Sequence, residues 1–246
     1  MQTILFKDLG MIDYQTAWNL QELLLKENAL RKSATKTGIG PEALIAEEET
    51  THHLLFVEHP PVYTLGKSGL MEHVLVTMPQ LQKTGIEFFK TNRGGDITFH
   101  GPGQLVGYPI LDLEKFYRDI GRYLRNLEEV VIRVMADFGL QGERSKGETG
   151  VWIDPLVPGK QRKICAIGVR CSRWITMHGF ALNVNTDLDY FNQIIPCGIP
   201  DKQVTSLKKE LGREVSMDVV KKRLVGHFGD VFESEIIHAS QQPIEL

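Results

Sequence analysis

The chain has 246 residues, of which 42% are hydrophobic and 24% are charged, so it can bury the core of one large domain or of two small ones. Its formal net charge of −3 gives no reason to expect a nucleic-acid partner, although a local basic patch could still receive an acidic protein. The longest apolar runs, such as Leu54–Val57, are far shorter than the roughly 20 residues of a membrane-spanning helix, and no membrane partner is expected.

The N-terminal residues show no basic stretch followed by an apolar one, which a secretory signal requires, so we expect a cytoplasmic protein. Cys165, Cys171 and Cys197 are odd in number and form no Cys-x-x-Cys pair. This pattern predicts neither a disulfide framework nor a zinc site, and we expect no cofactor.

In chain order, the first predicted element is a helix over residues 12–32, where apolar side chains recur at near-helical spacing. The stretch Lys32–Thr51 is polar and acidic and predicts a surface loop or short insertion. An apolar run predicts a buried strand over residues 53–59, which Pro60-Pro61 ends, and a second strand is predicted over residues 86–91.

The middle of the chain predicts a strand over residues 105–111, in which Pro109 would mark an edge or a bulge. The clearest pattern follows over residues 120–138, where apolar residues form one helix face and Gly139 supplies the stop.

The C-terminal half predicts three strands and then two helices. The strands cover residues 150–153, 163–171 and 174–183, and the helices cover residues 201–211 and a segment that begins at Ser216. Strands in pairs between helices favour an α+β fold with a large mixed sheet over a doubly wound sheet. We expect one domain over residues 1–246, with a frayed C-terminal tail over about 236–246.

The segment Arg93–Gln104 contains four glycines and a proline in twelve positions. Glycine lets the backbone approach a ligand closely, but a tight hairpin of structural glycines has the same composition. The segment does not match a dinucleotide-binding or phosphate-loop motif. Arg93 and His100 favour a pocket, because they are polar groups set among close-packed backbone.

Cys197 lies in the turn-forming sequence Pro196-Cys-Gly198. Free cysteines are usually buried in regular elements, as we expect for Cys165 and Cys171 in an apolar strand, whereas a turn displays its thiol. A nearby ammonium group lowers the pKa of a thiol below its free value of about 8.5. If the fold brings Lys163 to Cys197, the two residues form a dyad suited to acyl transfer through a thioester.

Other polar residues have simpler explanations. His178, beside Gly179, is more often a hydrogen-bonded structural residue than a catalytic one, and Lys163 ends a basic run whose lysines are usually solvated. The segment Asn185–Asp189 carries paired carboxylates, but capping by Thr186 or Asp187 explains it better than a metal site does.

Four motifs, in order and spacing, resemble the lipoyl(octanoyl) transferase family over roughly residues 52–211. They are Arg93–Gln104, Lys163–Gly168, His178–Asn183 and Ile195–Ile199. The insertion at 32–51 and Cys165, which stands where a smaller residue is commoner, depart from the pattern.

The resemblance implies a single catalytic domain that moves an octanoyl group from acyl carrier protein to a lysine of lipoyl-domain proteins. It implies that Cys197 carries the acyl thioester and that Lys163 tunes the thiol and shuttles protons. It further implies that the acyl pocket is lined by Arg93, Gly94, Gly95, Asp96, Ile97, Thr98, Phe99, His100, Ala166, Ile167, Gly168, Gly179, Phe180 and Ala181. The implied fold is that of the biotin and lipoate ligase catalytic domain: a large mixed sheet with helices and a smaller sheet.

Two other functions remain open on the same scaffold. An ATP-dependent lipoate or biotin ligase would need an adenylate-binding loop and a lysine but no nucleophilic cysteine. A non-catalytic paralogue would bind lipoyl domains without transfer, and we would expect it to have lost Cys197 or Lys163, both of which are present.

Overall fold

The computed structural model describes residues 1–37, 49–196 and 203–239. Its larger sheet has the strand order β10-β8-β9-β6-β2-β1-β11, and β7 pairs with β8. These strands are β1 (Gln2–Met11), β2 (His52–Glu58), β6 (Gln104–Ile110), β7 (Val151–Ile153), β8 (Arg162–Ser172), β9 (Ile175–Asn183), β10 (Gln203–Val204) and β11 (Ser234–His238). A smaller sheet has the order β4-β3-β5, built from β3 (Val62–Leu65), β4 (Glu87–Lys90) and β5 (Ile97–His100).

The larger sheet is mixed. Strand β1 runs parallel to both β2 and β11, and β10 runs parallel to β8. The central pairs β2–β6, β6–β9 and β8–β9 are antiparallel. A large mixed sheet, a smaller sheet and flanking helices confirm the predicted α+β class.

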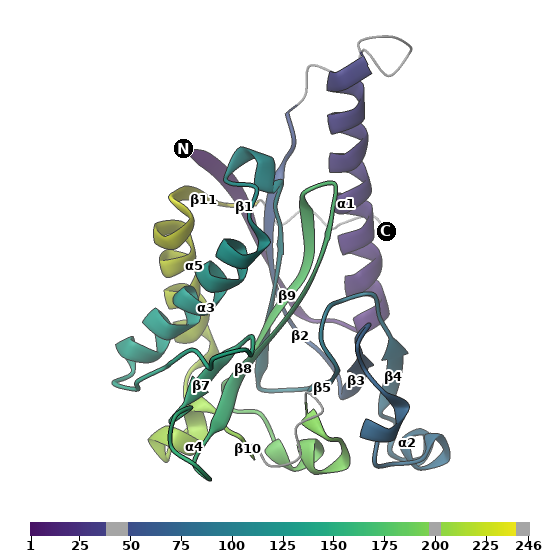
Figure 1. Ribbon diagram of the computed structural model, residues 1–246, viewed down its shortest axis with the longest axis vertical. Coiled ribbons are helices and arrows are strands. Elements are labelled where there is room, and N and C mark those ends of the chain that lie inside the picture. Colours follow the sequence, from purple (N-terminus) through teal and green to yellow (C-terminus); the bar gives the residue numbers. More distant parts are fainter. Residues whose placement is uncertain (38–48, 197–202, 240–246) are drawn as a thin grey trace.

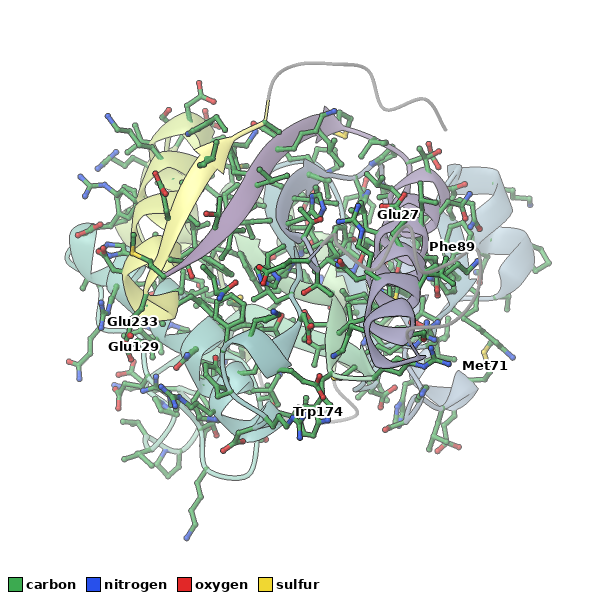
Figure 2. All side chains as sticks on the ribbon, turned by 90° about the horizontal axis from the view of Figure 1, so that it is seen from above. Glu27, Met71, Phe89, Glu129, Trp174 and Glu233 are labelled. Carbon is green, nitrogen blue, oxygen red and sulfur yellow. The ribbon has the colours of Figure 1, made fainter. Side chains whose placement is uncertain are left out.

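Helices cover both faces of the larger sheet (Figure 1). Helix α1 (Tyr14–Thr37) packs on β6 and β9, and α3 (Ile120–Asp137) packs with α5 (Met217–Phe232) on the other side. Accordingly, Figure 2 shows Glu27 of α1 on one side of the molecule and Glu129 of α3 on the other. The shorter helices are α2 (Met78–Thr84) and α4 (Leu207–Leu211), and 3₁₀ turns span Met71–His73, Leu113–Lys115 and Leu188–Gln193. None of the helices described is both long and apolar enough to cross a membrane.

Because helices cover both faces of the larger sheet, its central strands are buried on both sides. Every residue of β6 and β9 is buried, since side chains of both orientations meet a helix layer. Helix α3 matches the predicted helix closely: Asp119 caps its start by accepting a hydrogen bond from the Arg122 amide, and Gly139 follows its end with φ 76°.

Helix α1 continues beyond its predicted end, so residues 32–37 belong to the helix and not to a surface loop. Contacts with distant residues explain the extension. The Lys32 ammonium lies 2.7 Å from Asp112 and 3.0 Å from Glu114, and these ion pairs stabilise a polar helical turn that would be weak in isolation. The rest of the predicted insertion, residues 38–48, lies outside the described residues.

Two C-terminal predictions also need correction. Residues 236–238 are not part of a frayed tail, because they pair in parallel with β1 as the end of β11. The helix predicted over residues 201–211 begins only at Leu207, with Ser206 as its cap, and Gln203–Val204 form a strand beside β8. Residues 201 and 202 are not described.

Pro109 lies in a central strand and not at a sheet edge, with β2 on one side and β9 on the other. Pro109 is paired with Leu54 of β2, whereas the pairing between β6 and β9 stops at Gly107, before the proline. Strands β1, β3, β5 and β11 were not predicted.

Candidate active site

A cavity opens where the α1 face of the larger sheet meets the smaller sheet. The cavity brings together Lys163, Arg93, residues 95–98, His100, residues 166–168 and residues 179–181, all of which the sequence analysis had placed in the site. Gly94 and Phe99, which were also expected there, are not among its lining residues.

The floor of the cavity is a row of small side chains across three strands. Ala166 of β8 pairs with Ala181 of β9, which pairs in turn with Val106 of β6. Their short side chains leave the sheet surface low between Tyr14 on α1 and the segment 93–98. The floor is therefore apolar.

Gly168 allows the connection between β4 and β5 to approach β8. A Cβ at this position would lie 2.8 Å from the Gly94 carbonyl oxygen and 3.3 Å from the Arg93 side chain. The Gly94 amide donates a hydrogen bond of 2.9 Å to the Val169 carbonyl. At Gly94 and Gly168, the backbone of segment 93–98 thus packs directly against the backbone of β8.

Arg93 is buried and holds the glycine-rich turn together. Its guanidinium donates to the carbonyl and hydroxyl oxygens of Thr64, to the Asp96 carbonyl at 2.8 Å and to the Gly94 carbonyl at 3.0 Å. Phe99 points into the core of the smaller sheet, where it stacks on Tyr190 with ring centroids 4.4 Å apart.

Lys163 lies near the start of β8, between β7 and β10. It pairs with Trp152 on one side and with Val204 on the other, and its carbonyl accepts from the Thr205 amide at 2.9 Å. Only 9% of the residue is exposed. Its ammonium nitrogen lies 4.6 Å from the centroid of the Trp152 ring.

Cys197 lies outside the described residues, so the predicted Cys197–Lys163 dyad stays a prediction. The described residues on either side are anchored at the cavity. Before Cys197, the Ile195 amide donates to the His73 carbonyl, and the His73 ring contacts Asp96 in the cavity lining. After it, Val204 pairs with Lys163 itself.

Two buried histidines, His100 and His178, line the cavity, and a third, His59, lies beside His100 with ring centroids 5.9 Å apart. The hydrogen-bond partners of the three rings fix their tautomers. His59 donates from Nδ1 to the Ile12 carbonyl, so its Nε2 accepts from the Tyr108 hydroxyl at 2.7 Å. His100 donates from Nδ1 to the Gln104 side-chain oxygen. His178 donates from Nε2 to the Asn92 side-chain oxygen.

Burial lowers the pKa of all three rings, to about 4 for His59, to about 3 for His178 and well below 6.5 for His100. Burial likewise raises the pKa of Tyr14 to about 12 and that of Tyr108 well above 10. These groups are therefore neutral near pH 7 and add polarity without charge.

His178 has the hydrogen bond expected of a structural histidine, but it also lines the cavity. Its φ of 57° is in the left-handed region, which is rare for a residue inside a strand. Tyr14, Val106 and Tyr108 also line the cavity and were missed. They come from a helix face and a buried strand, where nothing local separates a lining residue from a core residue.

The two described cysteines behave as buried hydrophobes. Burial raises the pKa of the Cys165 thiol strongly and that of the half-buried Cys171 thiol less. Asp187 caps a 3₁₀ helix by accepting from the Asp189 amide, as expected for a capping residue. Within the described part of the chain, no three His, Cys, Asp or Glu side chains gather as metal ligands would.

The chain is similar to curated proteins over nearly its full length. It is 53% identical to the octanoyltransferase of Christiangramia forsetii over 94% of this chain and 96% of that protein. It is 54% identical to the octanoyltransferase of Flavobacterium johnsoniae over 95% of this chain and 98% of that protein.

Among solved structures, a putative lipoate protein ligase from T. acidophilum matches with a TM-score of 0.67 and 18% identity, over 97% of this chain and 88% of that chain. Lipoate-protein ligase A bound with ATP matches with the same TM-score and coverage at 17% identity. Such low identities support the fold alone. Residues 13–229 match the family described as the lipoyl protein ligase A/B catalytic domain, and the chain belongs to that family.

Proposed function

We propose that this protein is a lipoyl(octanoyl) transferase, active in the cytoplasm as one catalytic domain over residues 1–246. It takes an octanoyl group from octanoyl-acyl carrier protein, holds it as a thioester on Cys197 and passes it to a lysine amine of a lipoyl-domain protein. The observation that carries this proposal is the buried Lys163 ammonium in an apolar cavity floored by alanines, in a chain about half identical to curated octanoyltransferases.

In the first half-reaction, the Cys197 thiolate attacks the carbonyl carbon of the carrier thioester. The bond to the carrier sulfur breaks as the tetrahedral intermediate collapses, and Lys163 donates a proton to the departing thiol. One thioester replaces another, so this step is near neutral in free energy and needs no ATP.

In the second half-reaction, the acceptor lysine amine attacks the enzyme thioester. The carbon–sulfur bond breaks, an amide forms, and Lys163, which gave up its proton in the first step, takes one from the attacking nitrogen. Amide formation from a thioester is favourable. Both half-reactions thus use the same two side chains.

The cavity supports an aliphatic substrate. Each buried CH₂ contributes about 0.8 kcal/mol, so an octanoyl chain on the Ala166–Ala181–Val106 floor would be favoured over shorter acyl groups. The neutral state of His59, His100 and His178 suits this role, because a charged ring would weaken apolar binding.

The alternative is an ATP-dependent ligase, which the structural similarity to lipoate-protein ligase A would fit. The experiment that separates the two is incubation of the pure protein with octanoyl-acyl carrier protein, without ATP, followed by intact mass measurement. A transferase gains one octanoyl group on a cysteine, and a ligase gains none.

Filling the cavity floor should change chain-length preference. Ala181→Val adds two methyl groups at the centre of the floor, so we expect octanoyl transfer to fall several-fold more than butyryl transfer, each lost CH₂ contact weakening binding by about fourfold. Ala17→Val is the control, since it adds the same groups to the same core without lining the cavity. Equal losses for both acyl lengths would contradict this role of the floor.

Replacing the two other cysteines should spare activity. Cys165→Ala with Cys171→Ala removes a buried and a half-buried thiol and should lower the free energy of unfolding by about 1–2 kcal/mol while acyl-enzyme still forms. Intact mass and thermal melting test this. A folded double variant that forms no acyl-enzyme would move the nucleophile away from Cys197.

A further inference from the structure

The Lys163 ammonium rests on a buried aromatic face. Trp152 is 1% exposed, and its backbone pairs with Lys163 across the β7–β8 ladder. The ammonium lies 4.6 Å from the ring centroid, within the range of a cation–π contact. Tryptophan offers the strongest such face among the natural side chains.

The indole face can fix where this buried ammonium lies. The Lys163 side chain is largely removed from water, and a cation–π contact is stronger where water is excluded. The π face of Trp152 attracts the cation and carries no net negative charge.

The strand that carries Trp152 is fixed from several directions. The Trp152 amide and carbonyl exchange hydrogen bonds of 2.9 and 2.8 Å with Glu143. Two residues earlier, the Gly150 amide donates to the fully buried Glu128 carboxylate at 3.0 Å. Glu128 is itself ion-paired with Arg125 at 2.7 Å and with Arg144 at 3.1 Å.

Gly150 also leaves the Lys163 side chain its path. Its φ is 121°, and a Cβ there would lie 2.5 Å from the Cys165 carbonyl oxygen and 3.5 Å from Cε of Lys163. The stem of the lysine therefore runs beside bare backbone before its ammonium reaches the indole.

We propose that Trp152 is a positioning residue for acyl transfer, whose indole face holds the Lys163 ammonium in place. This inference rests on the proposed function, because it takes Lys163 as the partner of the Cys197 thiolate. Trp152 acts on the reaction only through Lys163.

The sharpest test replaces Trp152 with indoles of equal shape and a weaker π face. Tryptophans with one, two and three ring fluorines, introduced at position 152 alone, reduce cation–π attraction stepwise and leave packing almost unchanged. We expect the rate of Cys197 alkylation by iodoacetamide at pH 6.5 to fall with each fluorine, by about tenfold over the series. No trend in a folded series would overturn the proposal.

Conventional variants give an independent reading. Trp152→Phe keeps a weaker face and Trp152→Leu keeps none, so alkylation should slow in the order wild type, Phe, Leu. Trp174→Leu is the matched control, since Trp174 lies at the β8–β9 turn and at the periphery in Figure 2, away from the cavity. A Leu variant as reactive as wild type would also overturn the proposal.

A third set of measurements separates this inference from the proposed function. In a Lys163→Met background the fluorine series should have no effect, and a persisting trend would show that Trp152 acts otherwise than through Lys163. If Lys163→Met alone keeps full thiol reactivity, or if the wild type forms no acyl-enzyme, the failure belongs to the proposed function.

Discussion

Cys197→Ala is expected to abolish acyl-enzyme formation and to lower octanoyl transfer on the order of a thousandfold or more, because loss of the nucleophile removes the covalent route. The test is intact mass after incubation with octanoyl-acyl carrier protein, together with transfer to a lipoyl domain. The variant should show no mass gain, whereas the wild type gains one octanoyl group.

Two comparisons make this result specific. Cys171→Ala changes the same atom in a half-buried strand position and should leave the adduct unchanged. Cys197→Ser keeps the size of the side chain but replaces the thiol with a hydroxyl, whose far higher pKa leaves almost no anion near pH 7, and it should fail nearly as completely. An octanoyl adduct on Cys197→Ala would place the nucleophile elsewhere.

The parts of the fold that the sequence predicted are those with a local signal. Helix α3 has apolar residues at helical spacing, a capping aspartate and a glycine stop, and each of these acts within one element. Strands β2, β6 and β9 are apolar runs long enough to stand out, because helices bury both of their faces. Strand β8 was also predicted, although most of its residues are only partly buried.

The missed elements depend on distant partners. Strand β1 buries few of its residues and β11 is mostly exposed, so neither has a long apolar run. Strand β1 depends on parallel pairing with β2 and β11, and β11 depends on parallel pairing with β1. The last turns of α1 depend likewise on Lys32 reaching Asp112, eighty positions away. The helix or strand propensity of a short stretch of sequence carries no information about contacts with distant residues.

The candidate site divides in the same way. Segment 93–100 and the small residues of β8 and β9 were predicted from motifs, and most of them do meet at one cavity. Tyr14 and Tyr108 were missed, since a tyrosine on a helix face or in a buried strand resembles any other core aromatic. Gly94 and Phe99 were included because they belong to the motif, although the alternation of β5 turns Phe99 toward the core of the smaller sheet.

Lys163→Met should be the second most damaging change, with octanoyl transfer lowered by about a hundredfold to ten-thousandfold, the range expected for loss of a general acid–base group. Methionine keeps most of the lysine's apolar stem, so contact with Trp152 should persist while the charge is lost. The thiol should then titrate near its free value of about 8.5, and thiolate formation near pH 7 should fall.

The measurement is the rate of Cys197 alkylation between pH 5 and 10, taken beside acyl-enzyme formation by intact mass. Lys160→Met is the matched control, because it removes an exposed ammonium three residues before Lys163, in the connection between β7 and β8. A depressed thiol pKa favours thiolate at pH values between the wild-type pKa and the free value, so Lys163→Met should differ most from wild type at neutral pH and converge with it above pH 9, while Lys160→Met should follow wild type throughout. Identical alkylation profiles for wild type and Lys163→Met would exclude the ion-pair role, while a loss of transfer with an unchanged profile would leave Lys163 as a proton donor alone.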